Sequence, residues 1–286
     1  MSITLNAAAV ELFDSQVKKE YQEGYVLKGL CRQKTVAGAN KIYFPKMGNA
    51  IARQKEMHED VLPSNVAHSR VAATMENWYA AEYTDIFANN QTNFDEVSEL
   101  SELLKMGCGR RINKILIDAL VASSGTTIAN SVGGSNTNMN FEKFVAAMGV
   151  LDDNGVPQEG RTFVMNHNAY RNLLNDEEFI NSDYGQMRLD VTSQGDIKPY
   201  LGFNIVTLND SLETDGTVTG LPVDGSSDRT LLAFHRDALG LGFNMDIRSE
   251  VSYQETKLAT LSTVMFSAGA VAIDDAGIVK VTARQA

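Results

Sequence analysis

The feature that most constrains the fold is a long amphipathic segment, NFDEVSELSELLKMGCGRRINKILIDALV, at residues 93–121. Asn93 followed by Glu96 is a helix-capping signature, and acidic residues early with basic residues later suit the helix dipole. The pattern predicts one helix about 40 Å long, because each residue adds about 1.5 Å. Gly107 and Gly109 weaken its middle and allow a bend or close packing. The predicted apolar face consists of Val97, Leu100, Leu104, Cys108, Ile112, Ile115 and Ala119.

Before this helix, two strand patterns flank a highly charged segment. Residues 41–47, KIYFPKM, predict an edge strand because Pro45 has no N–H for a ladder. Residues 71–87 alternate with period two and predict one long strand. With residues 48–64 between them, they predict an extended hairpin, and a flexible surface loop is the alternative. The face expected to be shared along the second strand is Val71, Ala73, Met75, Tyr79, Ala81, Tyr83 and Phe87.

The tip of this hairpin and the N-terminal segment are the candidate contact surfaces. Residues 5–19 have a helical rhythm, and we interpret them as an arm rather than a core element. Projecting arms and hairpins suit a chain that buries them against other copies of itself. The contact residues predicted on the tip are Arg53, Lys55, Glu56, Glu59 and Asp60, and those predicted on the arm are Val10, Phe13 and Val17.

After the helix, residues 123–140 are rich in Ser, Thr, Asn and Gly and predict a linker, the best internal boundary. A mixed region follows, with short helices and buried strands. From residue 246 the chain returns to strand-like alternation, with a hairpin turn expected at 274–277. The helices expected in the mixed region are 141–151 and 167–174, and the strands are 161–165, 203–208 and 230–234.

Composition and charge exclude several classes of protein. Apolar residues make up 43% of the chain, which suits a packed core, but no apolar run is long enough to span a membrane. The net charge of -11 and the scattered basic residues disfavour a nucleic-acid-binding stripe. Cys31 and Cys108 lack the spacing of a zinc site or a disulfide framework. The chain begins without a secretory signal pattern, so we expect it to fold in a cytoplasm.

The sequence offers little catalytic chemistry. His235, Arg236 and Asp237 match the kinase triplet, but a kinase needs Asn five residues after the Asp, and Gly242 occupies that position. We interpret the triplet as the polar end of a buried strand. The sequence has no phosphate loop or nucleophile elbow, and its acidic Gly-containing segments predict turns rather than calcium loops. We expect no enzymatic activity, cofactor or metal; an enzyme with a scattered site is the alternative.

The order of these segments resembles the major capsid proteins of tailed bacteriophages with the Hong Kong 97-type fold, most closely those of short-tailed phages. Residues 34–50, KTVAGANKIYFPKMGNA, resemble the strand entering that family's extended hairpin, the E-loop. Residues 75–121 resemble the returning strand and the long spine helix of the P-domain. Residues 160–176, 196–210 and 231–242 are similar to segments of the A-domain, and the part from residue 246 resembles the return to the P-domain sheet.

The resemblance implies an α+β fold with an N-terminal arm at 1–38, an E-loop hairpin at 39–76 and a mixed α/β A-domain at 126–244. The P-domain is then discontinuous, at 77–125 and 245–286. It implies self-assembly into pentamers and hexamers of an icosahedral shell around double-stranded DNA, without sequence-specific binding. An encapsulin-like compartment is the alternative.

The resemblance also implies partners and a location. A separate scaffolding protein is expected because the arm begins almost at Met1. A portal and a decoration protein are further expected partners, with no membrane involved. The expected location is the virion capsid, with assembly in the host cytoplasm.

Overall fold

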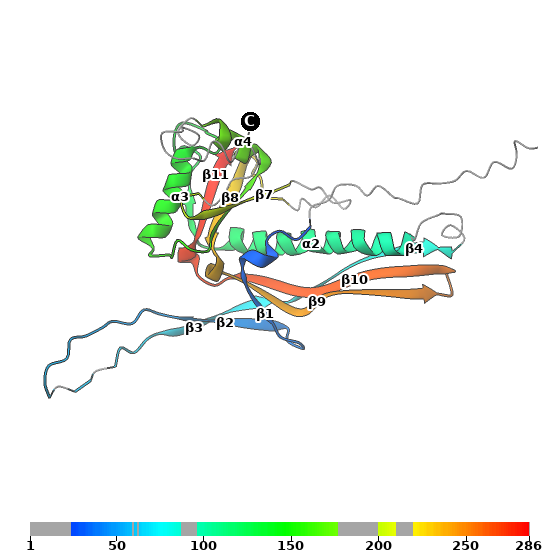
Figure 1. The fold of residues 1–286 in the computed structure, drawn as a ribbon, viewed down its shortest axis with the longest axis horizontal. Helices are drawn as coiled ribbons and strands as arrows, with labels where there is room; N and C mark the ends of the chain where they lie inside the picture. Colours follow the sequence, from blue (N-terminus) through cyan, green and yellow to red (C-terminus); the bar gives the residue numbers. More distant parts are fainter. Residues whose placement is uncertain are drawn as a thin grey trace, which may run out of the picture.

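A computed structural model describes residues 24–58, 60–61, 63–86, 96–176, 200–209 and 220–285. The described chain is built from a five-stranded sheet with two helices, a four-stranded sheet with one long helix, and a two-stranded hairpin. The hairpin projects away from both sheets (Figure 1). This arrangement is the α+β architecture expected from the sequence.

The long helix α2, Glu96–Ala122, runs along the four-stranded sheet (Figure 1). The sheet has the order β1-β9-β10-β4, from strands Arg32–Thr35, Leu239–Gln254, Ala259–Ala272 and Glu76–Asp85. Two members of the predicted apolar face, Cys108 and Ile112, are buried, as are Leu116 and Leu120 further along the helix. The predicted helix is confirmed over its described length, and Asn93 lies outside the described residues.

The single strand expected at residues 71–87 is wrong: the chain forms two strands that meet at Met75. Strand β3, His68–Thr74, pairs with β2, Lys41–Met47, whereas β4 pairs with β10. Because the chain changes sheet at Met75, the alternation changes phase, and Tyr79 is 78% exposed instead of sharing a buried face.

The inward residues of β4 are the even-numbered ones instead. Trp78 and Ala80 are half-buried and Thr84 is buried, and the Arg111 guanidinium of α2 lies 4.4 Å from the centre of the Trp78 ring. Ala81 and Tyr83, expected on the shared face, are exposed, and Phe87 lies outside the described residues. Helix α2 therefore covers the face of β4 that carries Trp78 and Ala80, whereas the sequence pattern predicted that the face with Tyr79 and Ala81 is buried.

The hairpin consists of β2, Lys41–Met47, and β3, in register from Lys41 opposite Thr74 to Met47 opposite His68. The predicted strand 41–47 is confirmed, and Pro45 is tolerated because the sheet has only two strands. A small separate core at its base contains Ile42, Phe44, Ala73 and Ile273.

Glycines of the four-stranded sheet let the base of the hairpin approach closely. A Cβ on Gly269 would lie 2.0 Å from the Thr74 carbonyl oxygen, and one on Gly242 would lie 2.9 Å from the Ile42 Cδ1 atom. A side chain at either position would therefore displace the hairpin, so these glycines fix where the hairpin leaves the body of the molecule.

The five-stranded sheet has the order β5-β11-β8-β6-β7. Its strands are Thr126–Ile128, Ile278–Arg284, Asp228–His235, Arg161–Asn166 and Phe203–Leu208. Helices α3, Phe141–Asp153, and α4, His167–Asn175, accompany it. The rings of Phe144, Phe163 and Phe203 form its core, with centroids 5.1 to 5.8 Å apart.

The helices and strands expected in this mixed region are confirmed, but the hairpin expected at 274–277 is wrong. Strand β11 does not pair with β10; it pairs with β8 and β5 in the other sheet. A short 3-10 helix, η5 at Asp275–Gly277, carries the chain from one sheet to the other. The division of the chain at residues 38, 76, 125 and 244 stays a prediction.

Candidate contact surfaces

The predicted charged residues of the hairpin lie at its tip, which we define as residues 48–67 between β2 and β3. Arg53, Lys55, Glu56 and Asp60 are all exposed, and Glu59 lies outside the described residues. The tip is tied at its base, where the Gly48 N–H donates to the Ala67 carbonyl at 2.9 Å. The Ser64 hydroxyl likewise donates to the Ile51 carbonyl at 3.0 Å.

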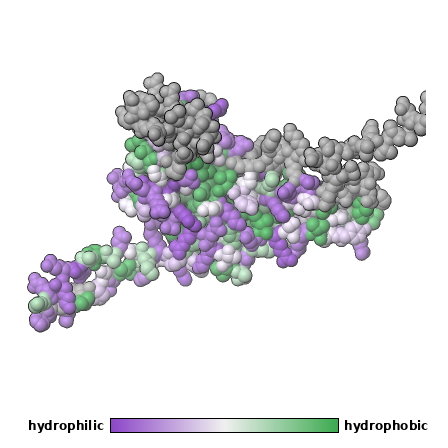
Figure 2. All heavy atoms as spheres, viewed as in Figure 1, coloured by the Kyte–Doolittle hydropathy of each residue, from purple (hydrophilic) through white to green (hydrophobic). Residues whose placement is uncertain are grey.

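Sequence reasoning missed the apolar residues of the same tip. Met57 is 92% exposed, Val61 76% and Ile51 71%, and Met47 at the end of β2 is also exposed. Figure 2 shows hydrophobic and hydrophilic side chains mixed along this projection. The sequence signal that could have indicated them is the presence of large apolar residues in a segment too charged to form a core of its own. Exposed apolar groups on a projecting element are typical of a surface that another protein covers.

The predicted arm residues Val10, Phe13 and Val17 lie outside the described residues, but the root of the arm, which we define as residues 24–31, is described. The Asn113 side chain of α2 is buried and accepts from the Leu27 N–H at 3.2 Å while donating to the Gly24 carbonyl at 3.0 Å. Tyr25 packs against Gly109, where a Cβ would lie 2.7 Å from its ring. The helix thus holds the segment from which the arm departs.

An ion pair extends this attachment to the sheet. The Lys28 ammonium lies 3.0 Å from a carboxylate oxygen of Asp246 on β9 and 4.7 Å from the centre of the Phe243 ring. Burial opposes the ionisation of Asp246, but the Ile247 N–H and the Lys28 ammonium outweigh it and lower the pKa of this carboxyl. The charged form of Asp246 therefore stabilises the arm root.

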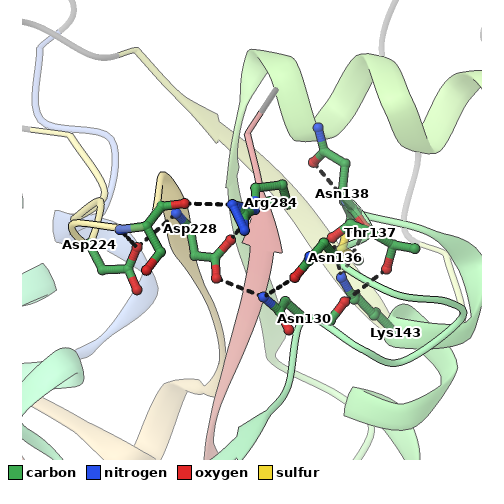
Figure 3. A network of polar contacts seen from close by, with 10 residues as sticks. Asn130, Asn136, Thr137, Asn138, Lys143, Asp224, Asp228 and Arg284 are labelled. Carbon is green, nitrogen blue, oxygen red and sulfur yellow. Dashed lines mark hydrogen bonds and ion pairs between the residues drawn. The ribbon is translucent and has the colours of Figure 1, made fainter.

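A polar network closes one end of the five-stranded sheet (Figure 3). Asp228 accepts from the Asn130 amide at 2.7 Å and pairs with the Arg284 guanidinium at 2.9 Å. The Lys143 side chain is fully buried, and its ammonium donates to the Thr137 carbonyl at 2.6 Å and the Asn138 carbonyl at 3.1 Å. Burial lowers the pKa of Lys143 to about 8, against the opposing effect of Asp228. The segment expected to be a linker therefore contains strand β5 of the sheet and a hydrogen-bonded loop.

The triplet of His235, Arg236 and Asp237 lies where β8 ends and a 3-10 turn begins. The His235 ring bonds to two backbone groups, the Glu159 carbonyl at 2.9 Å and the Asp237 N–H at 3.2 Å. This placement agrees with a polar end of a buried strand.

The acidic turn at residues 152–155 ends helix α3, with Gly155 at a φ of 69°. Asp152 pairs with the buried Arg161 guanidinium at 2.6 Å, so the turn has a structural role. Within the described ranges, no group of three His, Cys, Asp or Glu side chains is placed to hold a metal ion. None of the described helices is both long and apolar enough to cross a membrane.

Comparison with protein families gives one match over almost the whole chain. The family model described as "Phage capsid protein" matches residues 5–284. No curated protein matches the sequence.

Solved structures share the fold at low sequence identity. The capsid of the cyanophage P-SCSP1u is 14% identical with a TM-score of 0.74, and the match covers 98% of this chain and 94% of that one. The head structure of Helicobacter pylori bacteriophage KHP40 is 10% identical with a TM-score of 0.73, covering 100% and 98%. The capsid of Ralstonia phage GP4 is 10% identical with a TM-score of 0.70, covering 100% and 98%.

Proposed function

The chain belongs to the phage capsid protein family and is a major capsid protein of the Hong Kong 97-type fold; we propose that its copies assemble through the hairpin tip into pentamers and hexamers of an icosahedral shell. One observation carries the role of the tip. Three large apolar side chains, Ile51, Met57 and Val61, are more than two-thirds exposed on an element that projects from the body (Figure 1). Burial against a neighbouring copy would remove this apolar surface from water.

Apolar and charged side chains at the tip contribute differently to the free energy of the proposed contact. Burying each of the three apolar side chains is worth about 1.5–3 kcal/mol, whereas an exposed ion pair is worth about 0–1 kcal/mol. The apolar residues therefore supply most of the affinity. Arg53, Lys55, Glu56, Glu59 and Asp60 set the register with the neighbour, since complementary charge favours specificity over strength.

The proposed content of the shell is double-stranded DNA, held without sequence-specific contacts. The net charge of -11 supports this, because a chain with few clustered basic residues gains little from neutralising phosphates. We further propose that the shell belongs to a tailed phage with a short tail. Scaffolding, portal and decoration proteins would complete the particle, which would assemble in the host cytoplasm.

The test of the tip is its replacement. Deleting residues 50–63 should leave a folded chain that no longer forms shells, as seen by electron microscopy of particles made with the neighbouring virion genes. A second variant with a Gly-Ser segment of the same length at 50–63 keeps the reach of the hairpin and removes only the side chains. Normal particles from either variant would refute the proposed contact.

Two rival functions have distinct outcomes in the same preparations. An encapsulin-like compartment would give closed shells that hold a protein cargo and no nucleic acid. An enzyme would give a monomer that persists with scaffold present and turns over a substrate. We propose a purely structural role. It is supported by the side chains of His235, Asp152 and Lys143, which bond to backbone groups or form an ion pair within the chain.

A further inference from the structure

Two short 3-10 turns form the corner at which the chain passes between its two large sheets. Turn η4, Arg236–Ala238, joins β8 of the five-stranded sheet to β9 of the four-stranded sheet. It packs against η5, where the Ile273 N–H donates to the Ala238 carbonyl at 2.7 Å and a Cβ on Gly277 would lie 2.8 Å from the Ala238 Cβ. The structure of this corner therefore depends on how firmly η4 is held.

The His235 side chain holds η4 from its first residue. Its Nε2 lies 2.9 Å from the Glu159 carbonyl oxygen, and its Nδ1 lies 3.2 Å from the Asp237 backbone nitrogen. A carbonyl only accepts a hydrogen bond and a backbone N–H only donates one. Both contacts are satisfied together only by a neutral ring with its proton on Nε2, so the backbone assigns the tautomer.

Several charged groups lie on the elements around η4, namely Arg32 and Lys34 on β1, Glu159 and Arg161 at the start of β6, and Asp274 and Asp275 beside η5. On the segment entering β6, Glu159 contributes its carbonyl, and Arg161 pairs with Asp152 of α3 at 2.6 Å. Beside η5, Asp274 pairs with Lys46 at 2.8 Å, and Asp275 is the first residue of η5. Arg236 and Asp237 belong to η4, where the Arg236 N–H donates to the Gly160 carbonyl at 3.1 Å. The two hydrogen bonds of the His235 ring both have backbone groups as partners.

We propose that His235 is an acid-sensitive switch for this corner. A protonated ring carries a donor on each nitrogen, so Nδ1 can no longer accept from the Asp237 N–H, and two donors face each other. Histidine gains its proton in mild acid, between about pH 8 and pH 5. The neutral ring fixes η4, and protonation loosens η4 and the corner that it forms with η5. This switch belongs to the single chain and does not depend on shell assembly.

Hydrogen exchange of the unassembled full chain at a series of pH values tests the switch. After correction for the intrinsic pH dependence of exchange, peptides covering 231–242 should exchange about fivefold faster at pH 5.5 than at pH 7.5, the equivalent of one lost hydrogen bond. His235→Gln should abolish this step, because glutamine has no proton to gain. His167→Gln, which changes a histidine at the start of α4, should retain it.

Nitrogen NMR of the histidine rings gives a second measurement that needs no variant. At pH 7.5 the His235 ring should report a neutral form with its proton on Nε2. A proton on Nδ1, or a step in exchange that survives in His235→Gln, would overturn the proposal. Equal exchange at both pH values in the wild-type chain would also overturn it.

Discussion

At the scale of single residues, burial shifts the pKa of Lys143 away from that of an ordinary lysine. Its pKa is lowered from 10.5 to about 8 because its ammonium is buried. The folded chain therefore loses this proton at a lower pH than the unfolded chain does. Between about pH 8 and pH 10.5 unfolding takes up a proton, so the contribution of Lys143 to the free energy of unfolding increases as pH rises through that window.

The corresponding prediction uses Lys143→Met. At pH 7.5 this change removes the donor of the Asn138 carbonyl and should cost about 1 kcal/mol, partly offset by the loss of a buried charge. The cost should increase between pH 8 and pH 10 in urea titrations, because only the wild type gains stability there. Lys280→Met is the matched control, since the Lys280 ammonium also bonds a backbone carbonyl, that of Ser123 at 2.8 Å. An equal increase in both variants would contradict the assignment.

Cys31 gives a second prediction at this scale. Burial raises the pKa of its thiol to about 12, against the opposing charges of Arg236 and Lys28. Because the thiolate is the reactive form, Cys31 should react with a disulfide reagent at pH 8 at least about 100-fold more slowly in the folded chain than in urea. Cys108→Ala isolates Cys31 as the sole thiol. Fast labelling of that variant under native conditions would mean that the arm root opens freely.

At the scale of elements, two glycines of helix α2 have opposite roles despite their spacing of two residues. A Cβ on Gly107 would meet only the end of the Arg110 side chain at 3.6 Å. A Cβ on Gly109 would lie 2.7 Å from the Tyr25 ring and 3.0 Å from its backbone nitrogen. Gly107 thus leaves room for a side chain, whereas Gly109 is required for the arm root to dock.

Alanine at each position should separate these roles. Gly107→Ala should stabilise the chain by about 0.5–1 kcal/mol, because alanine favours a helix interior. Gly109→Ala should give no such gain and should speed the exchange of the Leu27 amide, which Asn113 holds. Thermal melts and hydrogen exchange measure the two effects. A gain at Gly109 equal to that at Gly107 would show that Tyr25 is not held against the helix.

The elements show what sequence can and cannot predict. The helix at 93–121 and the strand at 41–47 were predictable because their patterns are local. The break at Met75 was not, since each half of residues 68–85 alternates correctly for its own sheet and only long-range pairing changes the phase. The turn at 274–277 was misassigned for the same reason: β11 pairs with β8, about 50 residues away, and not with its neighbour in sequence.

The candidate contact surface was predicted in part. Charge in residues 48–64 is visible in composition, so the exposure of the charged tip residues was predictable, and their contact with a neighbour stays a prediction. The exposure of Met57, Ile51 and Val61 was not predicted, because a sequence does not reveal that a segment projects away from every core that could cover it.

At the scale of the whole molecule, the projecting hairpin implies that the final packing is completed between chains. The body has its own core, with the rings of Phe144, Phe163 and Phe203 packed between α3 and the five-stranded sheet, and Ile112 and Leu116 on the buried face of α2. The chain should therefore fold before it assembles. If the proposed tip contact forms, each copy both offers a hairpin and receives one, so weak contacts add up once a shell closes.

The different roles proposed for the apolar and the charged residues of the tip predict different salt responses for two sets of variants. Replacing Ile51, Met57 and Val61 by serine should stop shell formation at every salt concentration, because apolar burial is not screened. Neutralising Arg53, Lys55, Glu56 and Asp60 as Gln, Gln, Gln and Asn should slow assembly or produce aberrant particles relative to the wild type at low salt. At high salt this difference should disappear, since the charges of the wild type are screened as the screening length falls to about 3 Å at 1 M.

Light scattering over time, with electron microscopy of the products, measures both responses, and circular dichroism confirms that each variant is folded. If the neutral set fails at all salt concentrations while the serine set assembles, charge pairing rather than apolar burial carries the contact. That outcome would require ion pairs worth well above the usual 0–1 kcal/mol, and hence a tip fully desolvated in the neighbour. The expected result instead places the affinity in three side chains and leaves the charges to select the register.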